Sequence, residues 1–241
     1  VVGAAIGTVS AELVAASITM YILCFRSKEL SLRIDTGRFL PTWGVVKRAL
    51  HISLPMGLQQ TIMCSAYVMT TIIIAPLGTF AIAANSFGVI VESLCYMPGY
   101  GIADAATTLV GQSIGAGRHE LMKRFAWLSV GLGVTVMAVM GVVMYVGAPV
   151  AMAMMTPAEE VRRLGVEVLR IEAFAEPMFA AAIVSYGVFV GAAKTLVPSI
   201  MNLVSIWGVR ISLAALLAPS MGLRGVWIAM CIELCFRGFI F

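Results

Sequence analysis

The stretch FAWLSVGLGVTVMAVMGVVMYVGAPVAMAMMTP, residues 125–157, contains no Asp, Glu, Lys or Arg. A second uncharged run extends from Ala49 to Val91. A transmembrane helix needs about 20 apolar residues, so each run is longer than a crossing of the bilayer requires. Of the 241 residues, 61% are hydrophobic, and the mean hydropathy is +0.99. The sequence therefore predicts an integral membrane protein that folds as an all-α, polytopic bundle.

Seven apolar segments account for most of the chain, and proline or glycine marks several of the turns between them. They are residues 1–25, 49–75, 80–112, 125–155, 164–193, 197–218 and 225–241. The chain begins and ends inside apolar runs and has no initiator methionine. We therefore expect it to be a piece of a longer protein, with about seven spans and a truncated last helix.

The basic residues predict the orientation of these segments. One set of alternate connections carries ten Lys or Arg residues, and the opposite set carries three. Because cytoplasmic loops are enriched in Lys and Arg, we expect the first set to be cytoplasmic. It includes residues 26–48, the longest polar connection, whose mixed charges with Pro41 and Trp43 favour an interfacial helix that joins two halves.

Acidic residues at bilayer depth are costly and are candidates for function. Glu92 lies about 12 residues into its segment, which is roughly 18 Å along a helix. Asn85 lies two turns earlier on nearly the same face. The pair either binds an ion or a substrate, or makes a structural polar contact with a neighbouring helix.

Glu172 and Glu176 share one helix face, and Pro177 follows immediately. Proline lacks an N–H and displaces the carbonyl four residues earlier, that of Ala173. We expect a kink beside two acids that resist ionising together, with a spare carbonyl available to a cation. Alternatively, Glu172 lies at headgroup level and pairs with Arg170 or another basic residue.

Other polar residues favour a cavity or structural contacts. Gln59, Gln60 and Tyr186 are candidates for ion or substrate binding, although polar side chains also hold membrane helices together. We interpret Asp104 and Arg210 as structural charges, Asp104 near the cytoplasmic mouth and Arg210 in need of a carboxylate partner.

Pairs of residues four apart also predict packing. Glu233 and Arg237 are expected to pair with each other. The glycine pairs are expected to allow close helix contact; they are Gly3/Gly7, Gly111/Gly115 and Gly187/Gly191.

Several classes of protein are not supported. The five cysteines and two histidines form no metal-ligand pattern, and no His-Glu-x-x-His, Gly-x-Ser-x-Gly or phosphate-loop motif occurs. The net charge of +4 lies in the connections and does not suggest nucleic acid as a partner. We therefore expect neither an enzyme nor a protein with a cofactor or bound metal.

Three motifs in order resemble the MATE (multidrug and toxic compound extrusion) family of transporters. In chain order they are Leu54-Pro55 through Pro76-Leu77-Gly78, Thr107–Arg118 with the sequence TTLVGQSIGAGR, and Trp207–Arg210 followed by Gly222–Trp227. The resemblance implies helices six to twelve of a twelve-helix transporter: residues 1–25 end the N-terminal half, 26–48 form the cytoplasmic linker, and 49–241 form the C-terminal six-helix bundle.

The resemblance also implies a function. Such proteins exchange amphipathic or cationic small molecules for Na⁺ or H⁺ across a membrane, and the resemblance implies the bacterial inner membrane. The partners would be the substrate, the lipid bilayer and the missing N-terminal half. The acid position of helix seven falls near Met63, and that of helix ten falls near Phe179, so Glu176 is the nearest carboxylate.

Three alternatives remain open. A flippase for a lipid-linked sugar or other amphiphile would favour a more cationic cavity than the acidic residues at depth suggest. A membrane-embedded enzyme would need a nucleophile or a metal cluster. A non-transporting scaffold would not require buried acids.

The predicted orientation can be tested with single cysteines in the longer transporter, on a background without native cysteines. We expect Pro157→Cys to react with an impermeant maleimide in intact cells, because it lies on the side poor in basic residues. Arg38→Cys should react only after the membrane is opened. The reverse pattern of labelling would overturn the orientation.

Overall fold

The computed structural model describes residues 2–26 and 42–241, and its regular elements there are all helices. The chain divides into two compact units, residues 1–48 and 49–241. The first contains α1 (Val2–Tyr21), which continues into a short π-helical turn, Ile22–Arg26. Most of the expected interfacial segment lies outside the described residues, since 27–41 are not among them.

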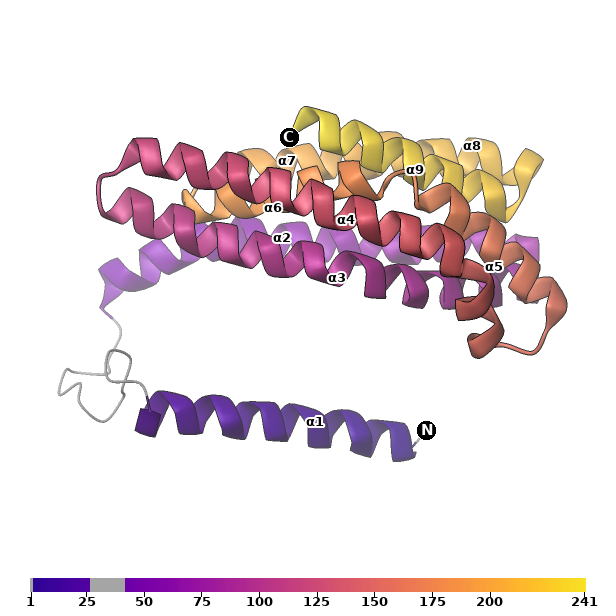
Figure 1. Cartoon of the computed structure of the whole chain (residues 1–241), viewed down its shortest axis with the longest axis horizontal. Helices are drawn as coiled ribbons and strands as arrows, with labels where there is room; N and C mark the ends of the chain where they lie inside the picture. Colours follow the sequence, from indigo (N-terminus) through magenta and orange to yellow (C-terminus); the bar gives the residue numbers. More distant parts are fainter. Residues whose placement is uncertain (1, 27–41) are drawn as a thin grey trace. The chain divides into compact units, whose positions relative to one another are not determined.

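Long helices make up the second unit, and they run roughly side by side (Figure 1). Their bounds are α2 Trp43–Ile74, α3 Thr79–Gly115, α4 His119–Met155, α5 Glu159–Glu172, α6 Glu176–Gly191, α7 Leu196–Leu203, α8 Ser212–Met221 and α9 Leu223–Ile240. A 3₁₀ turn, Ala75–Leu77, ends α2, and the π-helical stretch Val204–Ile211 links α7 to α8 as one long helix. Helix α2 begins a few residues before the boundary between the two units.

The predicted all-α polytopic fold is confirmed. Within the described residues the apolar segments are predominantly helical, and four helices there are long and apolar enough to cross a membrane. They are Trp43–Leu77, Thr79–Gly115, His119–Met155 and Leu196–Met221, and the bent pair of α5 and α6 would be a fifth. Helix α9 is not among these candidate spans, because its 18 residues include three charged side chains.

The predicted kink next to Pro177 is a full break in the helix. Helix α5 ends at Glu172 and α6 begins at Glu176, and their axes differ by 60°. The Ala175 N–H donates to the Glu172 carbonyl at 2.8 Å, which closes the turn. Pro177 has no N–H for the Ala173 carbonyl, and that oxygen would lie 2.8 Å from a Cβ on Gly141. Glycine at 141 thus lets α4 approach the break.

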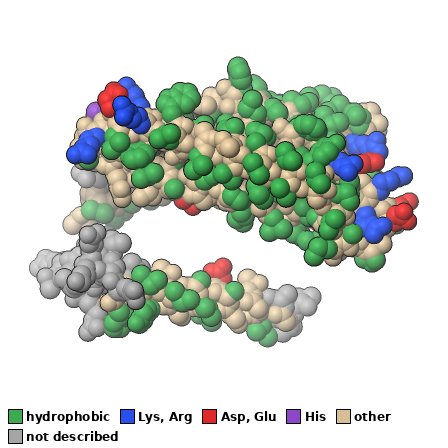
Figure 2. All heavy atoms as spheres, viewed as in Figure 1, with side chains coloured by type: hydrophobic (Ala, Val, Ile, Leu, Met, Phe, Trp, Pro, Cys, Tyr) green, Lys and Arg blue, Asp and Glu red, His purple; other side chains and the backbone are tan. Residues whose placement is uncertain are grey.

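On the face that Figure 2 shows, most exposed charged side chains of the bundle lie near its two ends, and hydrophobic side chains cover much of the surface between them. This distribution matches a bundle whose middle lies in the hydrocarbon of a bilayer. The α3–α4 turn contains Gly117 at φ +69°, a left-handed conformation that glycine adopts without strain. Short turns of this kind hold consecutive helices antiparallel.

Helices α3 and α6 meet backbone to backbone. A Cβ on Gly187 would lie 2.5 Å from the Ala103 carbonyl oxygen, and one on Gly191 would lie 2.5 Å from the Thr107 carbonyl oxygen. The expected role of Gly187/Gly191 is therefore confirmed, and Gly111 also faces Gly191. For Gly115 the prediction is wrong, because nothing lies within 4 Å of an added Cβ there. For Gly3/Gly7, which lie in the first unit, it stays a prediction.

We predict that Gly187→Ala destabilises the transporter, because the added methyl group would overlap a backbone carbonyl that cannot move aside. Overpacking of this kind costs about 1–3 kcal/mol. The matched control is Gly101→Ala on α3, where nothing lies within 4 Å of the added Cβ. Thermal unfolding in detergent should give a lower midpoint for Gly187→Ala alone. Equal midpoints for the two variants would contradict the close approach.

Candidate functional site

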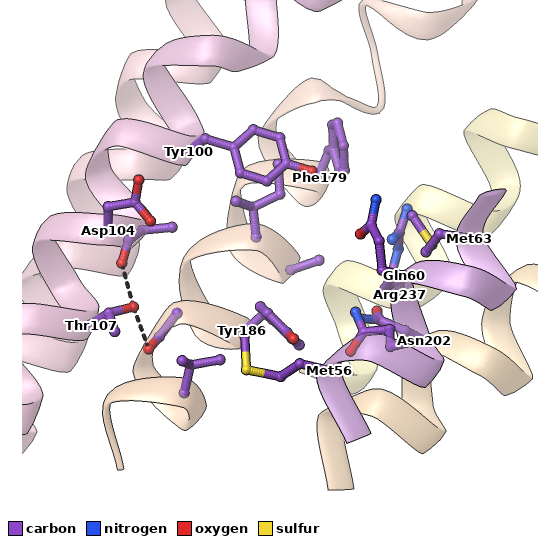
Figure 3. A pocket seen from close by; sticks show the side chains of 16 residues that line it. Met56, Gln60, Met63, Tyr100, Asp104, Thr107, Phe179, Tyr186, Asn202 and Arg237 are labelled. Carbon is purple, nitrogen blue, oxygen red and sulfur yellow. Dashed lines mark hydrogen bonds between the residues drawn. The ribbon is translucent and has the colours of Figure 1, made fainter. Parts of the chain in front are cut away.

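A cavity of about 330 Å³ opens on one side of the bundle, between α2, α3, α6, α7 and α9 (Figure 3). Methionine and aromatic side chains supply much of its lining, including Met56, Met63, Tyr100 and Phe179. Polar groups also reach it, namely Gln59, Gln60, Asp104, Thr107, Tyr186, Asn202 and Arg237. An apolar pocket with a few polar groups is typical of a small-molecule site.

Hydrogen bonds hold one wall of this cavity in place. The Ser199 hydroxyl donates to Gln59 Oε1 at 2.8 Å and also lies 2.7 Å from the Thr195 carbonyl oxygen. The Thr107 hydroxyl lies 2.8 Å from the Gly187 carbonyl oxygen, which ties α3 to α6 at the edge of the cavity. The predicted residues Gln59, Gln60 and Tyr186 therefore share one cavity with Asp104.

A buried ion pair forms part of the cavity wall. Arg237 Nε lies 3.0 Å from Glu233 Oε1, as the spacing of four residues predicted. Ser205, on the π-helical stretch, donates its hydroxyl proton to the Glu233 carboxylate at 2.6 Å. The Arg237 guanidinium also lies 5.4 Å from the centre of the Phe179 ring. The charge of Arg237 is thus balanced by Glu233 before any ligand enters.

Three other acids lie deeper, beyond the Phe179 side of the cavity. Glu92 is 7% exposed, and Glu172 and Glu176 are each 1% exposed. Among the described residues, neither carboxylate oxygen of Glu176 has a hydrogen-bond partner, and neither does Oε2 of Glu172. The three carboxylates interact electrostatically with one another. An ionised carboxylate buried in this way is costly unless a positive charge joins it.

Glu172 does not pair with Arg170, contrary to what one alternative expected. Its side chain is buried where α5 ends, whereas Arg170 is exposed and lies 5.2 Å from the centre of the Tyr145 ring. Glu172 and Glu176 lie on opposite sides of the helix break, so the chain direction changes between them. The break leaves both acids pointing into the protein and takes them off a single continuous helix face.

Asn85 and Arg210 have different surroundings from those expected. The Trp227 indole N–H donates to Asn85 Oδ1 at 3.1 Å, which links α3 to α9 away from the cavity. Arg210 donates a hydrogen bond to the Met230 sulfur and has no carboxylate within 4 Å in the described part of the chain. It does interact electrostatically with Glu92 and Glu172, so its charge offsets part of theirs.

Arg237 is a charged residue of the cavity lining whose position there we did not predict. Its spacing from Glu233 indicated an ion pair, but that pairing predicted a structural role for both side chains. Only the packing of α9 against α6 brings the guanidinium to Phe179 and the cavity. Within residues 2–26 and 42–241, no group of three or more His, Cys, Asp or Glu side chains is arranged to hold a metal ion.

Sequence comparison places this fold among known proteins. The family model MatE matches residues 55–216. The probable multidrug resistance protein NorM of Thermotoga maritima is 28% identical over 240 residues, which are 98% of this chain and 50% of that protein. The protein of the same name from Xylella fastidiosa is 29% identical over 197 residues, covering 81% and 42% respectively. The chain thus spans about half the length of the curated relatives it matches.

Solved structures agree with the family match. The crystal structure of MATE in complex with MaL6 has a TM-score of 0.87 at 20% identity, and covers 99% of this chain and 54% of that chain. A MOP superfamily transporter from Pyrococcus furiosus has a TM-score of 0.85 at 20% identity over the same shares. These likenesses show a common helical fold. With a family model that matches well over half of its residues, the chain belongs to the MatE family.

Proposed function

We propose that this chain is the C-terminal half of a multidrug efflux transporter in the inner membrane of a bacterium. The transporter exports amphipathic or cationic organic molecules in exchange for Na⁺ or H⁺. The family match, and relatives named as multidrug resistance proteins of about twice this length, support the proposal. MatE proteins are transporters and not enzymes, which agrees with the lack of a catalytic motif in the sequence.

One observation carries the proposal for the coupling site. Glu172 and Glu176 are buried on the two sides of a helix break and present carboxylate oxygens without any donor. Broken helices with acids near the middle of the membrane commonly form the ion sites of secondary transporters. Either a proton on the acid or a coordinated cation satisfies such an oxygen. The Ala173 carbonyl, which Pro177 cannot bond, lies in the same break.

The cavity is the proposed substrate site of this half. Its methionine and aromatic lining adapts to different apolar shapes, which suits a transporter of varied drugs. The Tyr96 ring packs edge-on against Phe179 with ring centres 5.7 Å apart, and Tyr96 also interacts with Glu92 and Glu176. Phe179 therefore separates the cavity from the acids. A drug in the cavity and a coupling ion at the acids would compete, because both sites share this wall and both ligands are positively charged.

The charge balance favours cationic cargo over an anionic lipid-linked sugar. The buried charges of the bundle include four acids, Glu92, Glu172, Glu176 and Glu233, and the arginines near them are Arg210 and Arg237. Glu233 neutralises the arginine on the cavity wall. The remaining field is therefore negative and attracts positive ligands. A flippase for an anionic substrate would need the opposite balance.

Glu176→Gln in the full-length transporter should abolish ion coupling, because it removes the charge and nearly preserves the shape. We expect drug-evoked ion flux in proteoliposomes to fall by at least tenfold, which corresponds to about 1.4 kcal/mol of lost coupling. The control is Glu120→Gln, an exposed residue at the start of α4. Flux that matches the wild type between about pH 6 and 8, at high and at low Na⁺, would eliminate Glu176 as the ion site.

Glu92→Gln tests the same cluster from α3. If Glu92 contributes the charge that attracts cationic drugs, its neutralisation should weaken dye binding while the protein still accumulates in the membrane. One buried charge affects affinity by about tenfold or more. Equilibrium binding of a fluorescent cationic dye measures this effect, with a neutral dye as the control. Unchanged affinity for the cationic dye would restrict Glu92 to helix packing.

A further inference from the structure

A second hollow of about 370 Å³ lies on the outside of the bundle, away from the cavity of the transport site. Helix α5 forms its floor and packs against both α4 and α9 (Figure 1). The lining consists of Tyr145, Arg170, Ile171, Phe174, Ile228, Cys231 and Ile232, none of which lines the first cavity. The groove is open, since Phe174 is 72% exposed and Tyr145 is 41% exposed.

Arg170 is the charged group in this groove, and it has no acidic partner. The carboxylate about one turn earlier on α5, that of Glu167, pairs with Arg224, whose Nη2 lies 2.6 Å from Glu167 Oε2. Within the described ranges no carboxylate lies within 4 Å of Arg170. Its guanidinium lies instead 5.2 Å from the centre of the Tyr145 ring, which fixes its position without neutralising it. The groove thus presents one uncompensated positive charge.

The groove changes from polar to apolar along α5. The outward residues of the helix are charged as far as Arg170, and four residues later the exposed side chain is Phe174. The Phe174 ring packs edge-on against Tyr145 with ring centres 5.8 Å apart. Side chains on a helix tilt toward its N-terminus, so Arg170 tilts toward the turn at 156–158 and away from Phe174. This order matches the boundary between headgroups and acyl chains.

We propose that this groove binds a phospholipid from the leaflet on the side of the 156–158 turn. The lipid phosphate lies against Arg170, and an acyl chain covers Phe174, Ile228 and Ile232. A phosphate supplies the negative charge that Arg170 lacks, and guanidinium binds phosphate oxygens through two parallel N–H groups. Basic pockets between membrane helices are known to bind lipid headgroups in this way. The proposal is independent of the coupling ion and of the drug.

The test is lipid retention by the full-length transporter. After purification in mild detergent and incubation with phosphatidylglycerol, native mass spectrometry counts the lipids that remain bound. We expect Arg170→Gln to reduce bound phosphatidylglycerol by about fivefold, the effect of one arginine near the membrane surface. Arg170→Lys should retain an intermediate amount, because lysine keeps the charge and loses the paired geometry. Phosphatidylglycerol should also raise the unfolding midpoint of the wild type and leave that of Arg170→Gln unchanged.

Arg163→Gln is the matched control, because Arg163 is exposed on the same helix and lies outside the groove. It should retain as much lipid as the wild type. Inorganic phosphate should not displace the lipid, since it lacks the acyl chain that fills the apolar half of the groove. Equal retention by Arg170→Gln and the wild type would overturn the proposal, and so would a site that free phosphate occupies equally well. If another protein segment covers the groove, the wild type itself will retain no Arg170-dependent lipid.

Discussion

A charged side chain inside a membrane bundle must find its partner within the protein, because hydrocarbon offers neither water nor counter-ions. This constraint accounts for the arrangement of the acids in this chain. Glu233 satisfies it with Arg237 and Ser205. Glu172 and Glu176 do not fully satisfy it, since Oε2 of Glu172 and both oxygens of Glu176 have no hydrogen-bond partner among the described residues. The difference separates a carboxylate that holds the structure together from two that are available to a mobile positive charge.

The helix break connects this electrostatic constraint to the backbone. A continuous helix would keep Glu172 and Glu176 one turn apart and would satisfy the carbonyls around them, except that of Ala173, which faces Pro177. The break between α5 and α6, with its bend of 60°, gives up those hydrogen bonds and turns both acids inward. Pro177 lowers the energetic cost of losing these hydrogen bonds, because it could not have donated one in any case. Gly141 makes the bend possible by letting α4 approach the Ala173 carbonyl.

Much of the fold follows from sequence pattern alone. The uncharged runs predicted the long helices, and Pro177 predicted the bend, because a missing donor has the same effect in any helix. The cavity was harder to predict, since it depends on which helices become neighbours. Gln59, Tyr186 and Arg237 come together only after α2, α6 and α9 have packed. The partner of Arg210 was missed for the same reason: a sulfur on α9 lies nearer than any acid of the described residues.

The backbone contact between α3 and α6 has a mechanical consequence. Where side chains separate two helices, small shear motions can be absorbed by changes of rotamer. At Gly187 and Gly191 no side chain lies between the backbones, and the Thr107 hydroxyl reaches across to the α6 carbonyl at 2.8 Å. This close contact leaves little room for the two helices to slide, so we expect α3 and α6 to move as one rigid unit. We then expect bending to concentrate at residues 173–175, where the helix is interrupted and the Ala173 carbonyl faces Pro177, so that this turn acts as a hinge.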